Sequence, residues 1–332
     1  MTQLTFEAAL QSAIVEEMRR DSRVLFLGQD VQWFGLDPDS LVEFGRERIL
    51  NTPISEAGFI GAATGAALTG MRPVVMLGCS TFLYSAMDQV VNQAAKSRYM
   101  FGGQASVPMV IRAPVLYTIS AAAHHSDRPW GLFAQAPGLK LIVPATPSDA
   151  KGLMKAAIRD GNPVICFEDA SLNGTVGDVP DGDYTVPIGM AEVKRTGESV
   201  TIVTLGGGVR HALTAADVLE NEGISAEVVD IRTVVPLDRN TIIRSVSKTG
   251  RLVVIDPAPR TCGVAAEVAA TIAEEAFDKL KAPIIRLTAP DLPVAFSPFL
   301  EPLLYPTADK VAAAVRKLLG ARALKRAVAN MP

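Results

Sequence analysis

Apolar and polar positions along the first half of the chain alternate between a helical period and short, continuous apolar runs. Residues 6–20 are amphipathic at helical spacing, and Thr5 is placed to cap the N-terminus of that helix. Its apolar face would consist of Phe6, Leu10, Ala13, Ile14 and Met18. Apolar runs follow at 24–27, 74–77, 109–112, 139–143 and 164–168. Because β-branched runs separated by helices are typical of parallel strands buried on both faces, the pattern predicts an α/β domain.

The composition changes near residues 171–198, where Gly, Asp and Pro accumulate, and this change predicts a linker. A second alternation follows, with strands expected at 200–205, 227–231, 252–255 and 284–287. Helices are expected near 209–222, 238–249, 263–280 and 308–319. We therefore predict two α/β domains with mostly parallel sheets. Their expected bounds are 1–185 and 199–320, with a linker at 186–198 and a tail at 321–332.

Composition and charge narrow the class of protein. The 332 residues carry 32 Lys and Arg against 35 Asp and Glu, a net charge of −3, which argues against a general nucleic-acid-binding protein. No apolar run reaches ~18 residues, so no membrane-spanning helix is expected. The mean hydropathy of +0.24 is positive for such a chain, which indicates a buried subunit interface.

The cysteines and the N-terminus bear on the compartment. The 3 cysteines, Cys79, Cys166 and Cys262, form no CxxC pair, and no basic-then-apolar leader is present. This usage is typical of a reducing compartment without a disulfide framework. We expect the bacterial cytoplasm or, for a mature organellar protein, the matrix.

The segment 51–59 (NTPISEAGF) contains the first candidate for chemistry. Ser55 could cap a helix, and Glu56 would lie at the start of that helix. The helix would contain the glycines Gly58, Gly61, Gly65 and Gly70. Each glycine inside a helix costs about 1 kcal/mol relative to alanine, so close approach of another backbone, chain or ligand is the expected reason for them. The residues alone leave two interpretations of Glu56 open: a functional carboxylate, or an acid favoured by the helix macrodipole.

Two adjacent histidines, His124 and His125, follow the small-residue loop 120–123. Their spacing does not support a two-histidine metal site on a helix. A loop histidine near a pocket suits proton transfer because its free pKa lies near ~6.5, although a polar loop residue remains the alternative.

The glycines at 206–208 open a helix after a strand, but His211 stands where a dinucleotide-binding motif needs its third glycine. We interpret that segment as a tight turn.

Five ordered motifs give the chain a resemblance over nearly its whole length. They are residues 51–74 (NTPISEAGFIGAATGAALTGMRPV), 87–103 (MDQVVNQAAKSRYMFGG), 137–169 (PGLKLIVPATPSDAKGLMKAAIRDGNPVICFED), 258–277 (APRTCGVAAEVAATIAEEAF) and 286–301 (RLTAPDLPVAFSPFLE). With these motifs the chain resembles the beta subunit of the thiamine-diphosphate-dependent first component of 2-oxo acid dehydrogenase complexes. That family includes the pyruvate, branched-chain 2-oxo acid and acetoin dehydrogenases.

The resemblance implies two transketolase-like α/β domains, a pyrimidine-binding domain followed by a C-terminal domain that serves mainly association. In this family a separate alpha subunit binds the diphosphate and Mg²⁺ through a GDG…NN motif. This chain lacks that motif, since the Asp181-Gly182-Asp183 segment has no asparagine pair after it. The resemblance therefore implies thiamine diphosphate as cofactor and activity only in an α₂β₂ heterotetramer, where each active site forms between chains. It also implies a lipoyl acyltransferase as a further partner.

Several residues match functional positions of the family. Glu56 matches the glutamate that activates the cofactor by hydrogen-bonding its pyrimidine ring nitrogen. Phe82 matches an aromatic residue that packs against the pyrimidine, with core packing as the alternative. His125 matches the histidine proposed to handle protons during acyl transfer to lipoyl. A structural K⁺ held by backbone carbonyls in several members would correspond to Met109, Ala157, Asp160 and Asn162.

The function implied is decarboxylation of a 2-oxo acid and transfer of the acyl group to lipoyl. Two alternatives are kept: an acetoin dehydrogenase or carboligase subunit with another carbonyl donor or acceptor, and a non-catalytic scaffold. The chain departs from the family at Asp127, where glutamine is common, and at Met76, where a glutamate is common. Residues 115–119 also replace a glycine-rich stretch. We expect these changes to affect the choice of donor or acceptor more than the fold.

Overall fold

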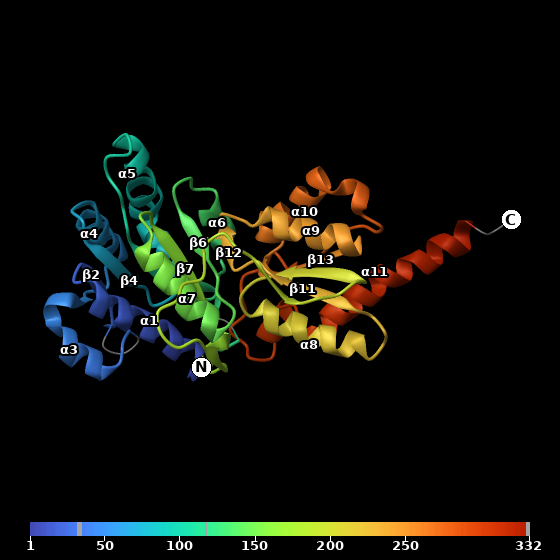
Figure 1. Ribbon diagram of the computed structural model, residues 1–332, viewed down its shortest axis with the longest axis horizontal. Coiled ribbons are helices and arrows are strands. Elements are labelled where there is room, and N and C mark those ends of the chain that lie inside the picture. The colour runs from blue at the N-terminus through green and yellow to red at the C-terminus, as the bar shows by residue number, and fades with distance from the viewer. Residues whose placement is uncertain (32–34, 117, 330–332) are drawn as a thin grey trace. The chain divides into compact units, whose positions relative to one another are not determined.

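The computed structural model describes residues 1–31, 35–116 and 118–329, with the side chains of 321–329 excluded. The chain forms two compact units (Figure 1). The first comprises Met1–Gly189 with Thr233–Pro236 and Val294–Pro298, and the second comprises Met190–Arg232, Leu237–Pro293 and Phe299–Pro332. Among the described residues, no helix combines the length and apolar character needed to cross a membrane.

The first unit is built on a seven-stranded sheet. Its order is β12 (Thr233–Val235), β6 (Lys140–Ile142), β7 (Val164–Asp169), β5 (Val110–Val115), β4 (Arg72–Met76), β2 (Val24–Gln29) and β3 (Ile49–Thr52). All neighbouring strands are parallel except β12, which is antiparallel to β6. Every residue of β7 is buried, as expected for a parallel strand covered on both faces.

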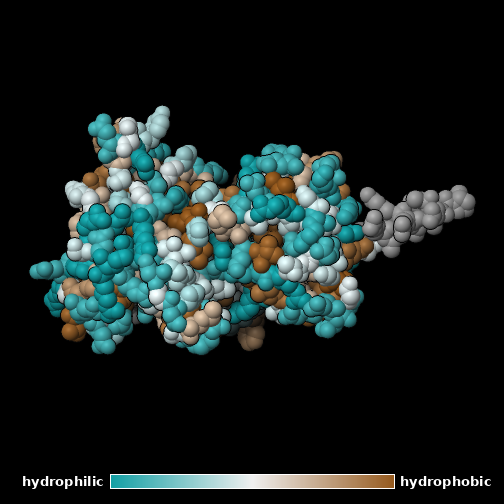
Figure 2. Space-filling view, in the orientation of Figure 1, coloured by the Kyte–Doolittle hydropathy of each residue, from teal (hydrophilic) through white to brown (hydrophobic). Residues whose placement is uncertain are grey.

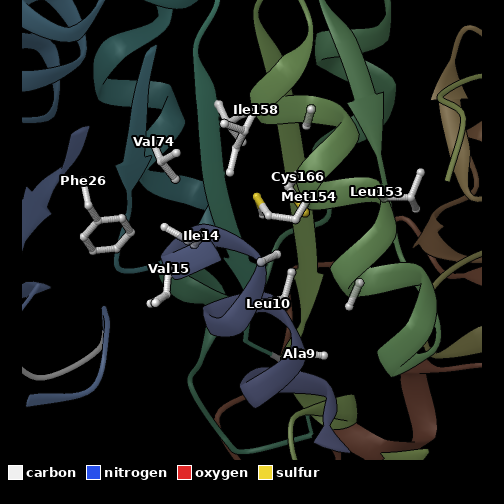
Figure 3. Packing of buried hydrophobic residues seen from close by; sticks show 14 of the residues in the cluster. Ala9, Leu10, Ile14, Val15, Phe26, Val74, Leu153, Met154, Ile158 and Cys166 are labelled. Carbon is white, nitrogen blue, oxygen red and sulfur yellow. The ribbon is translucent and has the colours of Figure 1, made fainter. Parts of the chain in front are cut away.

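Helices α1 (Phe6–Arg20) and α7 (Pro147–Arg159) pack against each other and against the strands. In Figure 3, side chains of both helices, among them Ile14 and Met154, point into a core with strand residues such as Val74 and Cys166. The apolar face predicted for residues 6–20 is fully buried, and Thr5 Oγ1 accepts a hydrogen bond from Ala8 N at 3.1 Å. Burial of each large apolar side chain of this kind contributes roughly 1.5–3 kcal/mol.

Helix α4 (Glu56–Leu68) packs on β4 and on two short helices, η1 (Ser80–Ala86) and η2 (Gln89–Ala94). The remaining elements of the first unit are α3 (Pro38–Arg48), α5 (Ala95–Met100), η3 (Ala123–His125), α6 (Trp130–Ala134), η4 (Ala170–Leu172) and the antiparallel pair β1 (Thr2–Thr5) and β8 (Val176–Val179). Figure 2 shows that apolar residues on the visible surface form scattered groups among polar ones. Exposed aromatic side chains include Tyr99 and Phe101 at the end of α5.

The second unit has a five-stranded sheet in the order β14 (Ile285–Ala289), β13 (Leu252–Pro259), β10 (Val200–Thr204), β11 (Ala226–Asp230) and β9 (Glu192–Arg195). Only β9 is antiparallel to its neighbour. The longer helices are α8 (Gly208–Glu220), α9 (Arg239–Thr249), α10 (Val264–Glu275) and α11 (Ala308–Ala329), and two short helices are η5 (Phe277–Lys279) and η6 (Glu301–Leu304). Helix α8 packs with α11, and α9 packs with α10. Figure 1 shows these two pairs on opposite faces of the sheet.

The predicted fold class is confirmed: both units are α/β with mostly parallel sheets. Residues 186–198, predicted as a linker, contain β9, which pairs with β11 in the second sheet. Strand β12 follows that segment in sequence yet belongs to the first sheet, so the units are less contiguous than the predicted ranges 1–185 and 199–320. The tail at 321–332 begins as a continuation of α11.

Two local expectations for α4 also need correction. Ser55 precedes the helix, but its side chain makes no capping bond and donates instead to Pro53 O at 3.2 Å. A side chain at Gly65 would meet no described atom within 4 Å, so no approach of this chain's own backbone explains that glycine. Gly70 ends the helix with a φ of +100°, a conformation that favours glycine.

Candidate functional site

A cavity of about 510 Å³ opens in the first unit where the carboxyl ends of β2, β4, β5 and β7 meet the N-terminal end of α1. Carboxyl ends of parallel strands are the usual place for a ligand in open α/β sheets. The lining residues are Glu7, Leu10, Gln29, Asp30, Met76, Leu77, Gly78, Cys79, Phe82, Arg112, Pro114, Leu116, Ile119, His125, Glu168, Ala170 and Asn173. The walls are mostly apolar, and the polar groups come from strands β2, β5 and β7, from helix α1 and from the loops.

Glu56 lies at the first turn of α4, where the helix dipole favours a carboxylate. Ser85 Oγ lies 3.3 Å from Glu56 Oε2 and 2.8 Å from Phe82 O, so its single proton is shared between two acceptors, the shorter contact being to the backbone of η1. Burial, assisted by the nearby Glu56 carboxylate, raises the pKa of the Cys79 thiol. Glu56 is half-buried, which leaves its carboxylate accessible beside η1.

Phe82 and His125 face each other at the rim of the cavity. Their ring centroids are 5.7 Å apart with an interplanar angle of 72°, an edge-to-face arrangement. His125 Nδ1 lies 3.1 Å from Ala121 O, so a proton on that nitrogen would leave Nε2 as the acceptor. Because the imidazole is exposed while Phe82 is half-buried, His125 can exchange protons with a bound molecule or with water.

The histidine loop is fastened to η1 by hydroxyl groups. Thr81 Oγ1 donates to His124 O at 2.5 Å, and Ser80 Oγ donates to Asp127 O at 2.7 Å. Tyr84 donates its phenol to Asp127 Oδ2 at 3.1 Å. Partial burial, together with the Asp127 carboxylate, raises the pKa of Tyr84 and keeps that phenol protonated. The departure at Asp127 therefore supplies an acceptor that ties the loop to Tyr84.

A buried ion pair, Arg112 with Glu168, forms part of the cavity lining. Arg112 Nε and Nη2 donate to the two carboxylate oxygens of Glu168 at 2.7 and 2.9 Å. The side chains are only 3% and 6% exposed. Burial by itself would lower the pKa of Arg112, but the charge and hydrogen bonds of Glu168 outweigh that effect and raise it. The third nitrogen, Nη1, is buried and has no hydrogen-bond partner among the described residues.

Gln29, at the end of β2, lies against the loop that follows β4. A Cβ atom at Gly78 would lie 3.0 Å from Gln29 Nε2 and 3.1 Å from the Phe82 ring, so a larger residue there would require these side chains to shift by a few tenths of an ångström. Gln29 Oε1 is buried without a hydrogen-bond partner among the described residues. Two residues that line the cavity thus each have a buried polar atom without a partner among the described residues, one a donor and one an acceptor.

Of the predicted site residues, Glu56, Phe82 and His125 are brought together through Ser85 and the ring contact. A carboxylate, an aromatic ring and an imidazole in this arrangement can bind and orient a nitrogen heterocycle and move a proton on it. The roles assigned to these residues remain predictions.

The predicted potassium ligands Met109, Ala157, Asp160 and Asn162 lie apart from this cluster, near the amino ends of β5 and β7. Carbonyls of three of them accept backbone or guanidinium bonds: Met109 O from Val164 N at 2.9 Å, Ala157 O from Asp160 N at 3.2 Å, and Asp160 O from Arg72 Nη1 at 3.0 Å. Lys140 Nζ lies 2.5 Å from Asp160 Oδ2. Two protein cations therefore already interact with Asp160. Among the described residues, no cluster of His, Cys, Asp and Glu side chains could hold a metal ion.

Ser85, Gln29 and the pair of Arg112 with Glu168 were not predicted from the sequence. A signal for the pair was available, because both charged residues lie within apolar runs that were predicted as buried strands. A charge in such a strand requires a partner. Ser85 and Gln29 left no comparable signal, since single polar residues near helix or strand ends are common.

The chain matches two family models, "Transketolase, pyrimidine binding domain" over residues 2–174 and "Transketolase, C-terminal domain" over residues 189–311. It is 45% identical to the acetoin:2,6-dichlorophenolindophenol oxidoreductase subunit beta of Bacillus subtilis (strain 168), covering 97% of this chain and 98% of the relative. It is 42% identical to the 2-oxoisovalerate dehydrogenase subunit beta of the same organism, with 96% and 99% covered.

The pyruvate dehydrogenase E1 component subunit beta of Rickettsia felis is 43% identical to this chain, with 95% of this chain and 98% of the relative covered. A solved chain described as "Split gene transketolase, inactive beta4 tetramer" superposes with a TM-score of 0.79 at 25% identity, covering 95% of this chain and 98% of that chain. The predicted resemblance and the two transketolase-like domains are confirmed by these matches.

Proposed function

Because the chain belongs to the family of beta subunits of the thiamine-diphosphate-dependent first component of 2-oxo acid dehydrogenases, we propose that it forms half of such an enzyme. The reaction we propose is decarboxylation of a 2-oxo acid followed by transfer of the acyl group to a lipoyl group. The observation that carries the proposal is the cluster of Glu56, Phe82 and His125 at the carboxyl edge of the first sheet. The three sequence relatives described above are oxidoreductase or dehydrogenase subunits, so a carboligase or a non-catalytic scaffold is not favoured.

The residues present fit the aminopyrimidine half of thiamine diphosphate. Glu56 offers a half-buried carboxylate at a helix N-terminus, which can hydrogen-bond a ring nitrogen, and Phe82 offers a ring face beside it. The bound cofactor would supply the electron sink for loss of CO₂. Glu56 would hold a proton at the ring nitrogen, Ser85 would keep the carboxylate oriented, and Phe82 would exclude water from the ring. His125 would move a proton at the reacting end, since its imidazole is exposed beside Phe82.

An alpha subunit is the expected partner, because the beta subunit family works with one and this chain has no GDG…NN motif. We propose an α₂β₂ heterotetramer in which the alpha subunit holds the diphosphate and Mg²⁺. The exposed glycines of α4, Gly58 and Gly65, support this arrangement because another chain can approach the helix backbone closely there. A lipoyl acyltransferase would receive the acyl group.

Two further expectations belong to this proposal. The cytoplasm of a bacterium or the matrix of an organelle is the proposed location. A bound K⁺ near Asp160 stays a prediction, and the ammonium of Lys140 and the guanidinium of Arg72 would compete with it.

The test is reconstitution with the cognate alpha subunit. We expect decarboxylation that requires thiamine diphosphate and Mg²⁺, measured as CO₂ release from pyruvate and from 2-oxoisovalerate. A parallel assay measures the cleavage of acetoin, which releases no CO₂. Acylation of a lipoyl domain, followed by mass spectrometry, then identifies the acceptor. Glu47→Gln, at an exposed carboxylate of α3, is the matched control for Glu56→Gln. A reconstituted complex that binds the cofactor yet turns over no 2-oxo acid would contradict the proposal.

A further inference from the structure

Three residues of the loop before His125 have a backbone conformation that favours glycine, although none of them is glycine. The φ angles of Thr118, Ser120 and Ala122 are +64°, +58° and +63°. Ala122 also has a ψ of −178°, which places it in a region that is populated almost only by glycine. A residue with a Cβ atom is strained there, so its surroundings must hold the backbone in place.

The two peptide groups that flank Ala122 hold the histidine. The carbonyl oxygen of Ala121 lies 3.1 Å from His125 Nδ1. The carbonyl oxygen of Ala122 accepts hydrogen bonds from His125 N at 3.3 Å and from Ser126 Oγ at 2.8 Å. Because φ turns the preceding planar peptide group and ψ turns the following one, the unusual angles of Ala122 direct both carbonyls toward the histidine segment.

Hydroxyl groups stabilise this strained loop at several points. Ser126, whose hydroxyl bonds to the strained residue, is fully buried. Thr81 Oγ1 donates to His124 O, and Ser80 Oγ donates to Asp127 O. A strained conformation persists only where the surrounding structure over-determines it, and such conformations are found mostly at functional sites. The strain therefore indicates a function for this loop.

The contact at Nδ1 decides which ring nitrogen of the neutral imidazole carries the proton. A carbonyl oxygen can only accept a hydrogen bond, so the contact with Ala121 O places the proton on His125 Nδ1. Nε2 is then the nitrogen that has a free lone pair. Because the imidazole is exposed and lines the cavity, Nε2 is the atom that can accept a proton from a bound molecule.

We propose that Ala122 is a positioning residue: its glycine-like backbone conformation fixes His125 in the Nδ1–H tautomer and leaves Nε2 as the proton acceptor. Ala122 acts through the carbonyl groups on its two sides. The consequence for catalysis rests on the proposed function, in which His125 moves a proton during acyl transfer. The tautomer itself is a property of this chain and is measured without turnover.

Two substitutions of Ala122 test the role of its backbone conformation. Glycine adopts the observed angles without strain, so Ala122→Gly should retain the tautomer. Valine is β-branched and disfavours positive φ, so Ala122→Val should turn the flanking peptide groups away from His125. Ala123→Gly and Ala123→Val are the matched controls, because Ala123 is the adjacent residue and begins η3.

The measurement is the ¹⁵N NMR spectrum of the full-length chain, labelled at its 3 histidines and recorded at an alkaline pH where the imidazoles are neutral. Protonated and unprotonated ring nitrogens have distinct chemical shifts, and His125→Ala assigns the signals. We expect the Nδ1–H form to dominate in wild type, in Ala122→Gly and in both Ala123 variants.

In Ala122→Val the ratio of the Nδ1–H to the Nε2–H form should fall by roughly 2–10-fold, the effect of losing one hydrogen bond. A dominant Nε2–H form in wild type would overturn the inference. So would a ratio that Ala122→Val leaves unchanged.

Thermal unfolding tests the strain separately. Glycine normally lowers stability because it increases the conformational entropy of the unfolded chain, so Ala123→Gly should lower the melting temperature. At Ala122 the relief of strain offsets this effect, and Ala122→Gly should melt at least roughly 3 °C above Ala123→Gly. Equal melting temperatures would show that Ala122 is unstrained and would contradict the inference, even if Ala122→Val does not fold.

The complex with the alpha subunit tests the consequence for catalysis. Ala122→Val should slow lipoyl acylation severalfold and more than it slows CO₂ release, whereas Ala122→Gly should retain both rates. Acylation at the wild-type rate by an Ala122→Val variant with an altered tautomer ratio would refute the role in acyl transfer. If the complex releases no CO₂ from any 2-oxo acid, the proposed function fails, while the NMR spectrum decides the tautomer independently.

Discussion

The buried pair of Arg112 and Glu168 gives a quantitative prediction for stability. Glu168→Gln keeps the shape of the side chain and can still accept one hydrogen bond, but it removes the negative charge. The guanidinium of Arg112, 3% exposed, would then be buried without a counter-charge. The variant therefore tests what happens when half of a desolvated ion pair is lost.

The expected magnitude follows from burial. An exposed ion pair contributes only about 0–1 kcal/mol, but removing one partner of a buried pair typically costs about 3–5 kcal/mol. Both side chains here are at most 6% exposed and the contact is bidentate, so the free-energy cost typical of a buried pair applies. We expect Glu168→Gln to lower the free energy of unfolding of the first unit by about 3 kcal/mol or more.

The double variant Arg112→Met with Glu168→Leu is the matched control. Replacing a whole buried ion pair by apolar residues of similar volume is often neutral or stabilising, so it should be more stable than the single variant. The difference between the double variant and the sum of the two single variants would measure a coupling energy of about 3 kcal/mol.

Urea unfolding followed by tryptophan fluorescence isolates the relevant transition. Both tryptophans, Trp33 and Trp130, belong to the sequence range of the first unit, so the signal reports that unit rather than the second. A loss below about 1 kcal/mol in Glu168→Gln, with an unchanged slope of the transition, would refute the reasoning that the pair is desolvated.

Three further predictions concern single residues. Glu56→Gln should preserve assembly with the alpha subunit, judged by size-exclusion chromatography, but lower kcat by about a hundredfold or more because an amide cannot share a proton with the ring; wild-type kcat would contradict its role. His125→Ala should impair lipoyl acylation more than the first CO₂ release, and equal losses in single-turnover assays of both steps would count against acyl transfer. Hydrogen bonding from Arg23 lowers the pKa of Asp21 from 3.8 to about 2. A lowered pKa stabilises the fold above 3.8 and loses that contribution as the pH falls toward 2. Asp21→Asn should therefore cost about 1 kcal/mol at neutral pH, with a difference from wild type that shrinks between pH 4 and 2 in urea titrations.

The regular elements could be predicted because their apolar periods are undisturbed. Residues 6–20 form α1 with the predicted face buried, and the apolar run 164–168 is β7 with one more residue. In both cases local spacing and tertiary burial agree, since the element contacts one continuous core.

What could not be predicted depends on partners distant in sequence. β12 is a three-residue strand that pairs with β6 although β9, β10, α8 and β11 of the second unit lie between them in sequence. The sequence position of Ser55 predicts a helix cap, but its hydroxyl donates a hydrogen bond to the carbonyl oxygen of Pro53 instead. The unsatisfied Arg112 Nη1 is a property of three-dimensional surroundings and leaves no pattern in a single sequence.

The site itself was predictable in part. The resemblance pointed to Glu56, Phe82 and His125, and the fold places them in one cluster linked by Ser85. The cavity behind Phe82 was not expected, because its residues come from five separate segments and include the departures at Met76 and at residues 115–119.

The position of β12 in the sequence, after three strands of the second sheet, has a consequence for folding during synthesis on the ribosome. The first sheet cannot acquire its outermost strand until Thr233–Val235 have left the exit tunnel, after β9, β10 and β11 have already emerged. Until then the edge of β6 offers unpaired amides and carbonyls to any neighbouring nascent chain. A polypeptide truncated near residue 190 would carry that open edge permanently, so separate expression of the N-terminal half invites aggregation.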